Sequence, residues 1–127
     1  FKSYGCVACH QGMNIGGNLY QKFGVFQAPS PPHDGDAQPD VGRYRVTSIE
    51  RDRGVFRVPS LRNVAVTAPY FHDGRAPTLE SAVEIMGRVQ LGRELAIEDI
   101  NAIVRFLRTL TGEYQGKALS IPTKGAP

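Results

Sequence analysis

The sequence predicts an all-α domain with long loops, and two observations support this fold class. Residues 78–86 and 97–111 repeat apolar side chains with the period of a helix. The 14 glycines and 9 prolines exceed the average share of these residues and indicate much loop for a chain of 127 residues. We therefore expect one domain at 1–112 with a small core, an additional group that helps to stabilise it, and an extended tail at 113–127.

The N-terminal half contains little regular structure. Residues 1–10 have the pattern of the end of an amphipathic helix, with Phe1 and Tyr4 facing inward. Residues 24–57 form a loop-rich insert, in which only the polar stretch 47–53 can make a helical turn. An irregular segment of this length is typical of a functional or partner-facing region.

Two helices are predicted in the C-terminal half. The first begins after a Thr78 cap, carries Met86 on its apolar stripe and stops at Gly87. The second covers residues 97–111, with acidic residues in its first turn, arginines towards its end and Gly112 as its stop. We expect this second helix to pack across the N-terminal one.

Composition argues against two classes of protein. A net charge of +3 and the absence of tryptophan give a weak case for nucleic-acid binding. No run of about 18 apolar residues is present, so no membrane-spanning helix is expected.

The chain begins at Phe1 without a leader or an initiator methionine, and we expect a processed or excised piece of a longer protein.

The only two cysteines lie in a Cys-x-x-Cys-His motif formed by Cys6, Cys9 and His10. This motif is the signature of covalent haem c attachment, in which each thiol adds to one vinyl group of the porphyrin. The two intervening residues let both sulfur atoms reach the ring edge, and the histidine binds the iron on the proximal side. A buried porphyrin also compensates for the small core. We therefore expect a cytochrome c-like fold, with long loops wrapped around one covalent haem c.

Three other interpretations of the motif are weaker. A thioredoxin-like dithiol follows a strand in a βαβ unit, and nothing resembling a strand precedes Cys6. A zinc site needs four ligands, and His33 and His72 do not have a paired spacing. A structural disulfide between Cys6 and Cys9 would close a very small loop and add little stability.

The second axial position of the iron has few candidates. Met13 is three residues from His10 and is confined to the same side of the ring. His33 stands in a turn-rich segment that is typical of a solvated histidine. Met86 would ordinarily be a core residue, but here it is the favoured ligand. His72 is the main alternative, because it can either bind the iron or lie beside the haem rim and form a hydrogen bond there.

Six arginines fall within twenty residues and face only two carboxylates. Most of them should form a solvated or partner-facing surface. Planar guanidinium groups also suit the carboxylates of haem propionates, and Arg62 is the candidate for this role. The six are Arg43, Arg45, Arg51, Arg53, Arg57 and Arg62.

The run from Phe56 to Arg75, followed by Thr78-Leu79-Glu80 and Met86-Gly87, strongly resembles the C-terminal haem domain of bacterial di-haem cytochrome c peroxidases. The resemblance covers nearly the whole chain, from Gly5 to Gly112. The broader group includes MauG-like enzymes, in which a tyrosine replaces the distal methionine. In this sequence Met86 stands where the ligand of the peroxidases is expected.

The resemblance implies a role in electron transfer. In that family the C-terminal haem accepts electrons from a small donor cytochrome c or cupredoxin. It passes them to a peroxidatic haem in an N-terminal domain, where hydrogen peroxide is reduced to water. A six-coordinate iron held by His10 and Met86 should not itself bind peroxide. The resemblance and the thioether chemistry also imply a periplasmic location and a possible homodimer.

The resemblance further implies a calcium ion near the domain boundary, bound by waters and by backbone carbonyls of a Thr-x-Pro segment. These positions correspond to Thr67 and Pro69, which otherwise simply form a turn. The side-chain ligand from the other domain is missing here, which puts calcium retention by this chain in doubt.

Two alternatives remain open for the function. The chain can be a free-standing mono-haem electron carrier, or His72 or an open iron site can make it catalytic in its own right.

Overall fold

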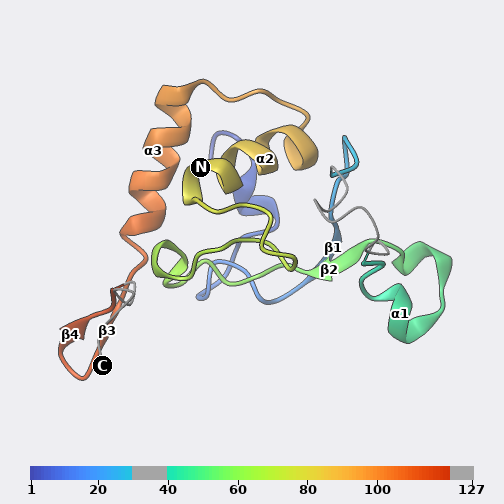
Figure 1. Cartoon of the computed structure of the whole chain (residues 1–127), viewed down its shortest axis with the longest axis horizontal. Coiled ribbons are helices and arrows are strands. Elements are labelled where there is room, and N and C mark those ends of the chain that lie inside the picture. Colours follow the sequence, from blue (N-terminus) through green and yellow to red (C-terminus); the bar gives the residue numbers. More distant parts are fainter. Residues whose placement is uncertain (30–39, 121–127) are drawn as a thin grey trace.

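The computed structural model describes residues 1–29 and 40–120, and the turn-rich stretch around His33 lies outside them. Figure 1 shows two longer helices at one end, a small sheet near the middle and a lobe around a short helix at the other end. In chain order, the elements are η1 (Cys6–Ala8), β1 (Tyr20–Lys22), α1 (Tyr44–Thr47), η2 (Glu50–Asp52), β2 (Val55–Arg57), η3 (Val64–Val66), α2 (Leu79–Leu91), α3 (Ile97–Arg108), β3 (Glu113–Tyr114) and β4 (Lys117–Ala118), where η marks a 3-10 helix.

The prediction of an all-α fold is wrong. About 35% of the described chain is helical, and α1 is only 4 residues long. Strand β1 pairs antiparallel with β2, so that Tyr20 lies opposite Arg57, and β3 pairs with β4 in a hairpin at 113–118. Three-residue strands contain too little apolar and polar alternation to be recognised in a sequence, and β1 and β2 are held together by contacts across more than thirty residues of chain.

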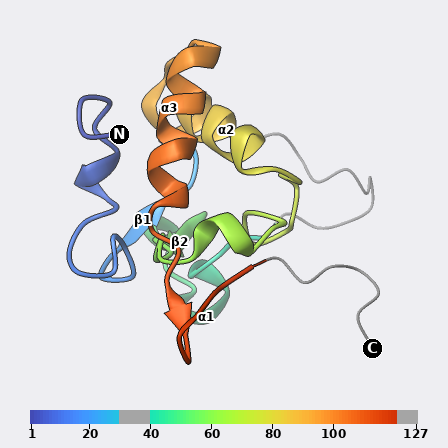
Figure 2. The ribbon, with the colours of Figure 1, turned by 90° about the vertical axis from the view of Figure 1, so that its left-hand side faces the viewer.

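The core lies between α2 and α3. Its buried side chains come from both helices, and the side chains of Phe1 and Tyr4 pack against it. The ring of Phe1 lies 4.9 Å from that of Phe106 in α3. Figure 2 shows α2 on one side of α3 and the N-terminal segment on the other. That segment is made of turns in place of the expected helix end, yet its aromatic side chains do face inward. The buried cluster is Leu79, Val83, Ile100, Ile103, Val104 and Leu107.

The start of α2 is as predicted, but its end is not. The hydroxyl of Thr78 accepts a hydrogen bond from Ser81 N, and Ser81 reciprocates at Thr78 N, which completes a capping box. The helix continues through Gly87 and ends at Gly92, which has a left-handed φ of 63°. A Cβ at Gly87 would lie 2.9 Å from Leu95 Cγ, so this glycine permits close packing inside the helix.

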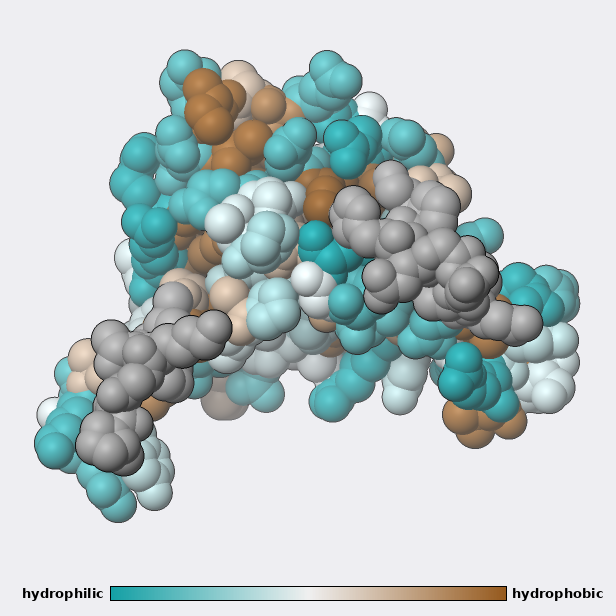
Figure 3. All heavy atoms as spheres, in the orientation of Figure 1, coloured by the Kyte–Doolittle hydropathy of each residue, from teal (hydrophilic) through white to brown (hydrophobic). Residues whose placement is uncertain are grey.

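Apolar surface is exposed at both ends of the molecule. Val46 in α1 is 87% exposed and Ile97 at the start of α3 is 59% exposed. Figure 3 shows hydrophobic surface over both regions. None of the helices in the described ranges has the length and hydropathy that crossing a membrane requires.

Candidate haem site

The Cys-x-x-Cys-His motif forms a single tight turn. Gly5 precedes it with a φ of 87°, which a residue with a side chain rarely adopts. The backbone N–H groups of Cys9 and His10 both donate to the carbonyl of Cys6, at 3.3 and 2.9 Å. These bonds bring the two cysteines and the histidine onto one turn of chain. Both thiols are free and half-buried, and burial raises the pKa of Cys6.

His10 is oriented by the loop that follows it. Its Nδ1 is buried and forms no hydrogen bond of good geometry with a described residue. Burial lowers the pKa of His10, and the nearby carbonyls of Ile15 and Pro59 oppose that shift. A Cβ at Gly16 would lie 3.3 Å from Nδ1 and only 2.1 Å from Pro59 O, so the loop reaches this position only because residue 16 is glycine. With Nδ1 turned towards the backbone, Nε2 is left as the ring nitrogen for a metal.

A strip of residues 57–62 braces this loop from the outside. Gly17 N donates to Val58 O at 2.8 Å, and Leu61 N donates to Ile15 O at 3.2 Å. The Ser60 hydroxyl donates to Asn14 O at 2.7 Å. Because these bonds join positions more than forty residues apart, the segment after β2 fixes the loop that carries Gly16.

Two arginines of this strip also bind the loop. Arg57 donates through Nε and Nη2 to Gly17 O, at 3.1 and 2.7 Å. Arg62 donates in the same way to Met13 O, at 3.2 and 2.8 Å. Two donor groups of Arg62 are therefore engaged by a backbone carbonyl next to the motif. A contact of Arg62 with a propionate remains a prediction.

His72 lies in an aromatic cluster formed by Phe23, Phe56, Phe71 and His72. Its ring stacks on Phe56 with centroids 4.3 Å apart and planes inclined by 19°. Phe23 lies edge-on to His72 at 6.3 Å and contacts Phe71 at 5.1 Å. The His72 Nε2 lies 3.9 Å from a carboxylate oxygen of Asp40. In the described chain, no hydrogen bond or ring contact joins His72 to His10.

The two methionines have different surroundings. Met13 is 86% exposed, and its carbonyl is held by Arg62. Met86 is half-buried in the third turn of α2, between the buried residues Val83 and Val89. Ligation of the iron by Met86 stays a prediction.

The Thr-x-Pro segment forms an exposed turn. The Thr67 hydroxyl donates to Val64 O at 3.2 Å, and Thr67 and Pro69 are both exposed. Within residues 1–29 and 40–120, no three His, Cys, Asp or Glu side chains lie close enough to hold a metal ion. A calcium ion at this turn would therefore depend on backbone carbonyls, water and groups from elsewhere.

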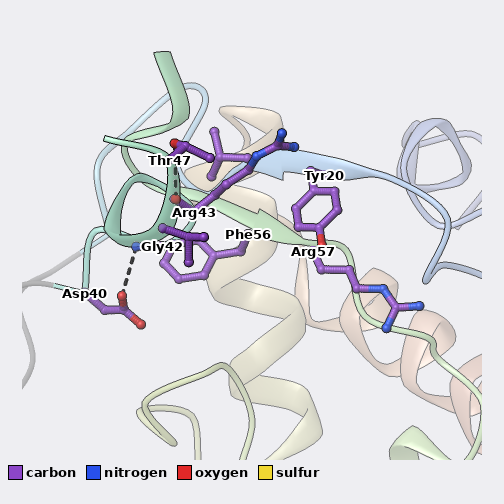
Figure 4. Close-up of a pocket in the computed structure, with 9 residues that line it drawn as sticks. Tyr20, Asp40, Gly42, Arg43, Thr47, Phe56 and Arg57 are labelled. Atoms are coloured by element: carbon purple, nitrogen blue, oxygen red, sulfur yellow. Dashed lines mark hydrogen bonds between the residues drawn. The ribbon is translucent and has the colours of Figure 1, made fainter. Parts of the chain in front are cut away.

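An open groove of about 600 Å³ lies on the α1 side of the small sheet. Figure 4 shows Tyr20, Arg43 and Phe56 among the residues that line it, and Asp40 accepting a hydrogen bond from Gly42 N. Arg43 is paired with Asp52 at 3.2 Å. No residue of the Cys-x-x-Cys-His motif lines this groove, but the groove shares Arg57 with the strip that braces the loop after His10.

The described residues fit a covalent haem c. Two free thiols and a histidine share one turn, the histidine's Nδ1 is buried beside backbone carbonyls, and Gly16 leaves room for that arrangement. Sequence reasoning recognised the motif and missed its supports, which are Gly16, Ser60 and the contact of Arg57 with Gly17. The sequence feature that pointed towards them was the run that begins at Phe56, which resembles the cytochrome c peroxidase family.

A single Cys-x-x-Cys-His turn braced by neighbouring loops defines a c-type cytochrome domain. The chain is 54% identical over 121 residues to the cytochrome c551 peroxidase of Nitrosomonas europaea, and 48% identical over 115 residues to that of Pseudomonas aeruginosa. The chain belongs to this cytochrome c peroxidase family, which implies haem c as its cofactor.

Other comparisons agree with this assignment. The cytochrome c peroxidase Ccp of Escherichia coli is 46% identical over 114 residues. A solved structure, a MauG-like protein associated with microbial copper homeostasis, matches 87% of the chain and 43% of its own, with a TM-score of 0.66 and 26% identity. No protein-family model matches. The first two relatives match 95% and 89% of this chain but only 35% and 32% of their own length, so the chain spans about a third of them.

Proposed function

We propose that this chain is the haem c electron-transfer domain of a di-haem cytochrome c peroxidase. It accepts single electrons from a small donor cytochrome c or a cupredoxin and passes them to a peroxidatic haem in an N-terminal domain. There, hydrogen peroxide takes up two electrons and two protons and gives two molecules of water. The names of the relatives support peroxide reduction as the overall reaction. The chain matches about a third of each relative's length, which supports a role for it as one domain of such an enzyme.

The contrast between the two methionines carries this proposal. Met13 lies next to the motif with its side chain in solvent, whereas Met86 is half-buried on a helix that packs in the core. A haem iron with histidine and methionine ligands has a raised reduction potential and no free position for peroxide. Such a site suits electron transfer rather than catalysis.

The residues of this chain hold the cofactor and set its surroundings. Cys6 and Cys9 would form the two thioether bonds, and His10 would bind through Nε2, since its other nitrogen faces the backbone. The sulfur of Met86 would supply the second ligand to the iron. When bound, the haem supplies an iron that alternates between the ferric and ferrous states. Because the loops around His10 are braced by Arg57 and Arg62, little rearrangement should accompany the change in charge.

Four further properties belong to the proposal. Thioether formation and the named relatives support a periplasmic location. The backbone carbonyls of Thr67 and Pro69 would contribute to a calcium site that is completed by a second domain. His72 stays beside the haem rim as a group that does not bind the iron, and the whole protein forms a homodimer.

The visible spectrum of the oxidised holo-protein tests the ligand set. A far-red charge-transfer band from the methionine sulfur to the iron should be present in the wild type and lost in Met86→Ala. It should survive in His72→Ala and in the matched control Met13→Ala. A band that persists in Met86→Ala would overturn the assignment of the ligand and the closed site with it.

A further inference from the structure

The two halves of α2 are held in place by different contacts. Leu79 and Val83, in the N-terminal half, belong to the core shared with α3. The C-terminal half contains Val89, which is only 2% exposed but is not part of that cluster. Met86 lies at the junction between the two halves. Its position therefore depends on whatever fixes the last turn and a half of the helix.

The last turn of α2 is tied to residues 22–27 by its side chains and its backbone. The amide of Gln90 accepts a hydrogen bond from Gly24 N at 3.0 Å through Oε1, and donates one to Lys22 O at 3.0 Å through Nε2. In addition, Phe26 N and Gln27 N both donate to Val89 O, at 3.0 and 3.3 Å. Both ends of one side-chain amide are thus used to hold a segment that is 66 and 68 residues away in the sequence.

This segment has little freedom to adapt. Gly24 has a φ of 89°, and a Cβ there would lie 2.7 Å from Gln27 O. A Cβ at Gly92, at the end of α2, would lie 2.9 Å from the ring of Phe26. Residues 22–27 therefore run close against the end of α2. The backbone on both sides of the contact fixes the positions of Lys22 O and Gly24 N, which Gln90 binds.

The same segment is anchored to the rest of the molecule through Phe23, which stands between the two positions that Gln90 holds. Phe23 N donates to Gly54 O at 2.9 Å, next to the β1–β2 pair. The Phe23 ring contacts Phe71 at 5.1 Å and Phe56 at 6.5 Å. Gln90 consequently joins α2 to the small sheet and its aromatic cluster.

We infer that Gln90 is a positioning residue for Met86: by holding Lys22 O and Gly24 N, it fixes the half of α2 that carries the proposed axial ligand. Met86 and Gln90 are four residues apart and lie on the same side of the helix. Loss of the Gln90 bonds leaves the helix end tied to this segment by the two backbone bonds to Val89 O, and the sulfur of Met86 is then held less firmly at its ligand position. This inference rests on the proposed ligation by Met86.

The test compares the oxidised holo-proteins of the wild type, Gln90→Leu and Glu84→Leu. Gln90→Leu removes both hydrogen bonds and adds no sulfur or nitrogen atom that could bind iron. Glu84→Leu is the matched control, because Glu84 is exposed on the same helix. In Gln90→Leu, the equilibrium constant between protein without the far-red band and protein with it, measured at one fixed pH, should rise about tenfold, which is the effect expected for losing hydrogen bonds of this kind. The control should match the wild type.

A second variant provides a rescue. In Gln90→Glu, the neutral carboxylic acid can accept from Gly24 N and donate to Lys22 O, as the amide does, whereas the carboxylate cannot donate. The far-red band and the reduction potential of Gln90→Glu should therefore approach the wild-type values near about pH 4 and depart from them at neutral pH. A purely structural role predicts lower melting temperatures with an unchanged band and potential.

The outcomes separate this inference from the proposed function. If Met86→Ala abolishes the band but Gln90→Leu retains it with an unchanged reduction potential, the positioning role is wrong and the ligand assignment stands. If Met86→Ala retains the band, the ligand assignment itself is wrong. If Gln90→Leu does not fold, Gln90→Glu decides the matter, and a band that does not respond to pH overturns the inference.

Discussion

The imidazole of His72 stacks on the ring of Phe56, with centroids 4.3 Å apart and planes 19° from parallel. Phe56 belongs to β2, which pairs with β1. His72 is thereby attached to the small sheet, and the carboxylate of Asp40 lies 3.9 Å from its Nε2. These contacts give His72 a structural role that does not require the iron.

Replacing His72 therefore separates packing from ligation. We expect His72→Phe to keep the stack on Phe56 and to melt close to the wild-type temperature, whereas His72→Ala removes it and lowers the stability by about 1 kcal/mol. Both variants should retain the far-red band of the oxidised protein. Thermal melts and spectra of the two holo-proteins check this. A wild type that lacks the band, together with a changed iron spectrum in His72→Phe, would instead make His72 an iron ligand.

Gly16 should tolerate no side chain. A Cβ at this position would lie 2.1 Å from Pro59 O, and the glycine φ of 126° is one that other residues rarely adopt. Gly16→Ala must push apart the loop and the strip that fix His10, and we expect a loss of several kcal/mol and little holo-protein. Gly54→Ala is a useful control, since Gly54 also has a positive φ, 71°, but nothing lies within 4 Å of its added Cβ. Equal yields of haem-loaded protein from the two variants would contradict the clash.

The features that could be predicted are those whose contacts join residues close together in the sequence. The Cys-x-x-Cys-His turn and the Thr78 cap are both local, because their hydrogen bonds span at most four residues. Gly87 shows where local reasoning fails. A glycine near the end of an apolar stripe is the usual helix stop, but here the helix continues and Gly87 makes room for Leu95.

The supports of the site could not be predicted in the same way. The bonds from Arg57, Ser60 and Arg62 to the loop after His10 join residues 40 to 49 positions apart. No periodicity or spacing marks such pairs, and an arginine that binds a carbonyl is indistinguishable in sequence from one on a solvated surface. The strands β1 and β2 were missed for the same reason, since each is fixed by its distant partner.

The cap of α2 should contribute measurably to stability. The Thr78 hydroxyl accepts from Ser81 N at 3.1 Å at the start of the helix that carries Met86. Thr78→Ala should lower the free energy of unfolding by about 1 kcal/mol, while Thr78→Ser keeps the acceptor and should cost only a few tenths. Denaturant titrations of both variants measure this, and similar losses would mean that the hydroxyl does not act as a cap.

The pair of Asp73 and Arg75 predicts a pH dependence in acid. Hydrogen bonds from Arg75 are the main cause that lowers the pKa of Asp73, and His72 adds to the shift. Since the folded-state pKa is below that of the unfolded chain, the stabilisation is fully present above about pH 4 and is lost as the pH falls through the lowered value. At pH 7 Asp73→Asn should be less stable than the wild type, by at most about 1 kcal/mol for a pair with this exposure, and the difference should shrink as the pH falls below about 4. A gap of constant size would contradict the assignment.

The proposed closed iron site makes a final prediction about peroxide. With His10 and Met86 both bound, the haem of this chain would have no position for hydrogen peroxide. Stopped-flow mixing of the ferric holo-protein with peroxide should therefore give no fast spectral change. Met86→Ala would remove one ligand and open that position, so this variant should show a fast spectral change with peroxide that the wild type lacks. Met13→Ala should stay as unreactive as the wild type, because Met13 is in solvent. Fast oxidation of the wild-type haem would instead mean that the domain performs peroxide chemistry itself, since the chain would then contain an open coordination position.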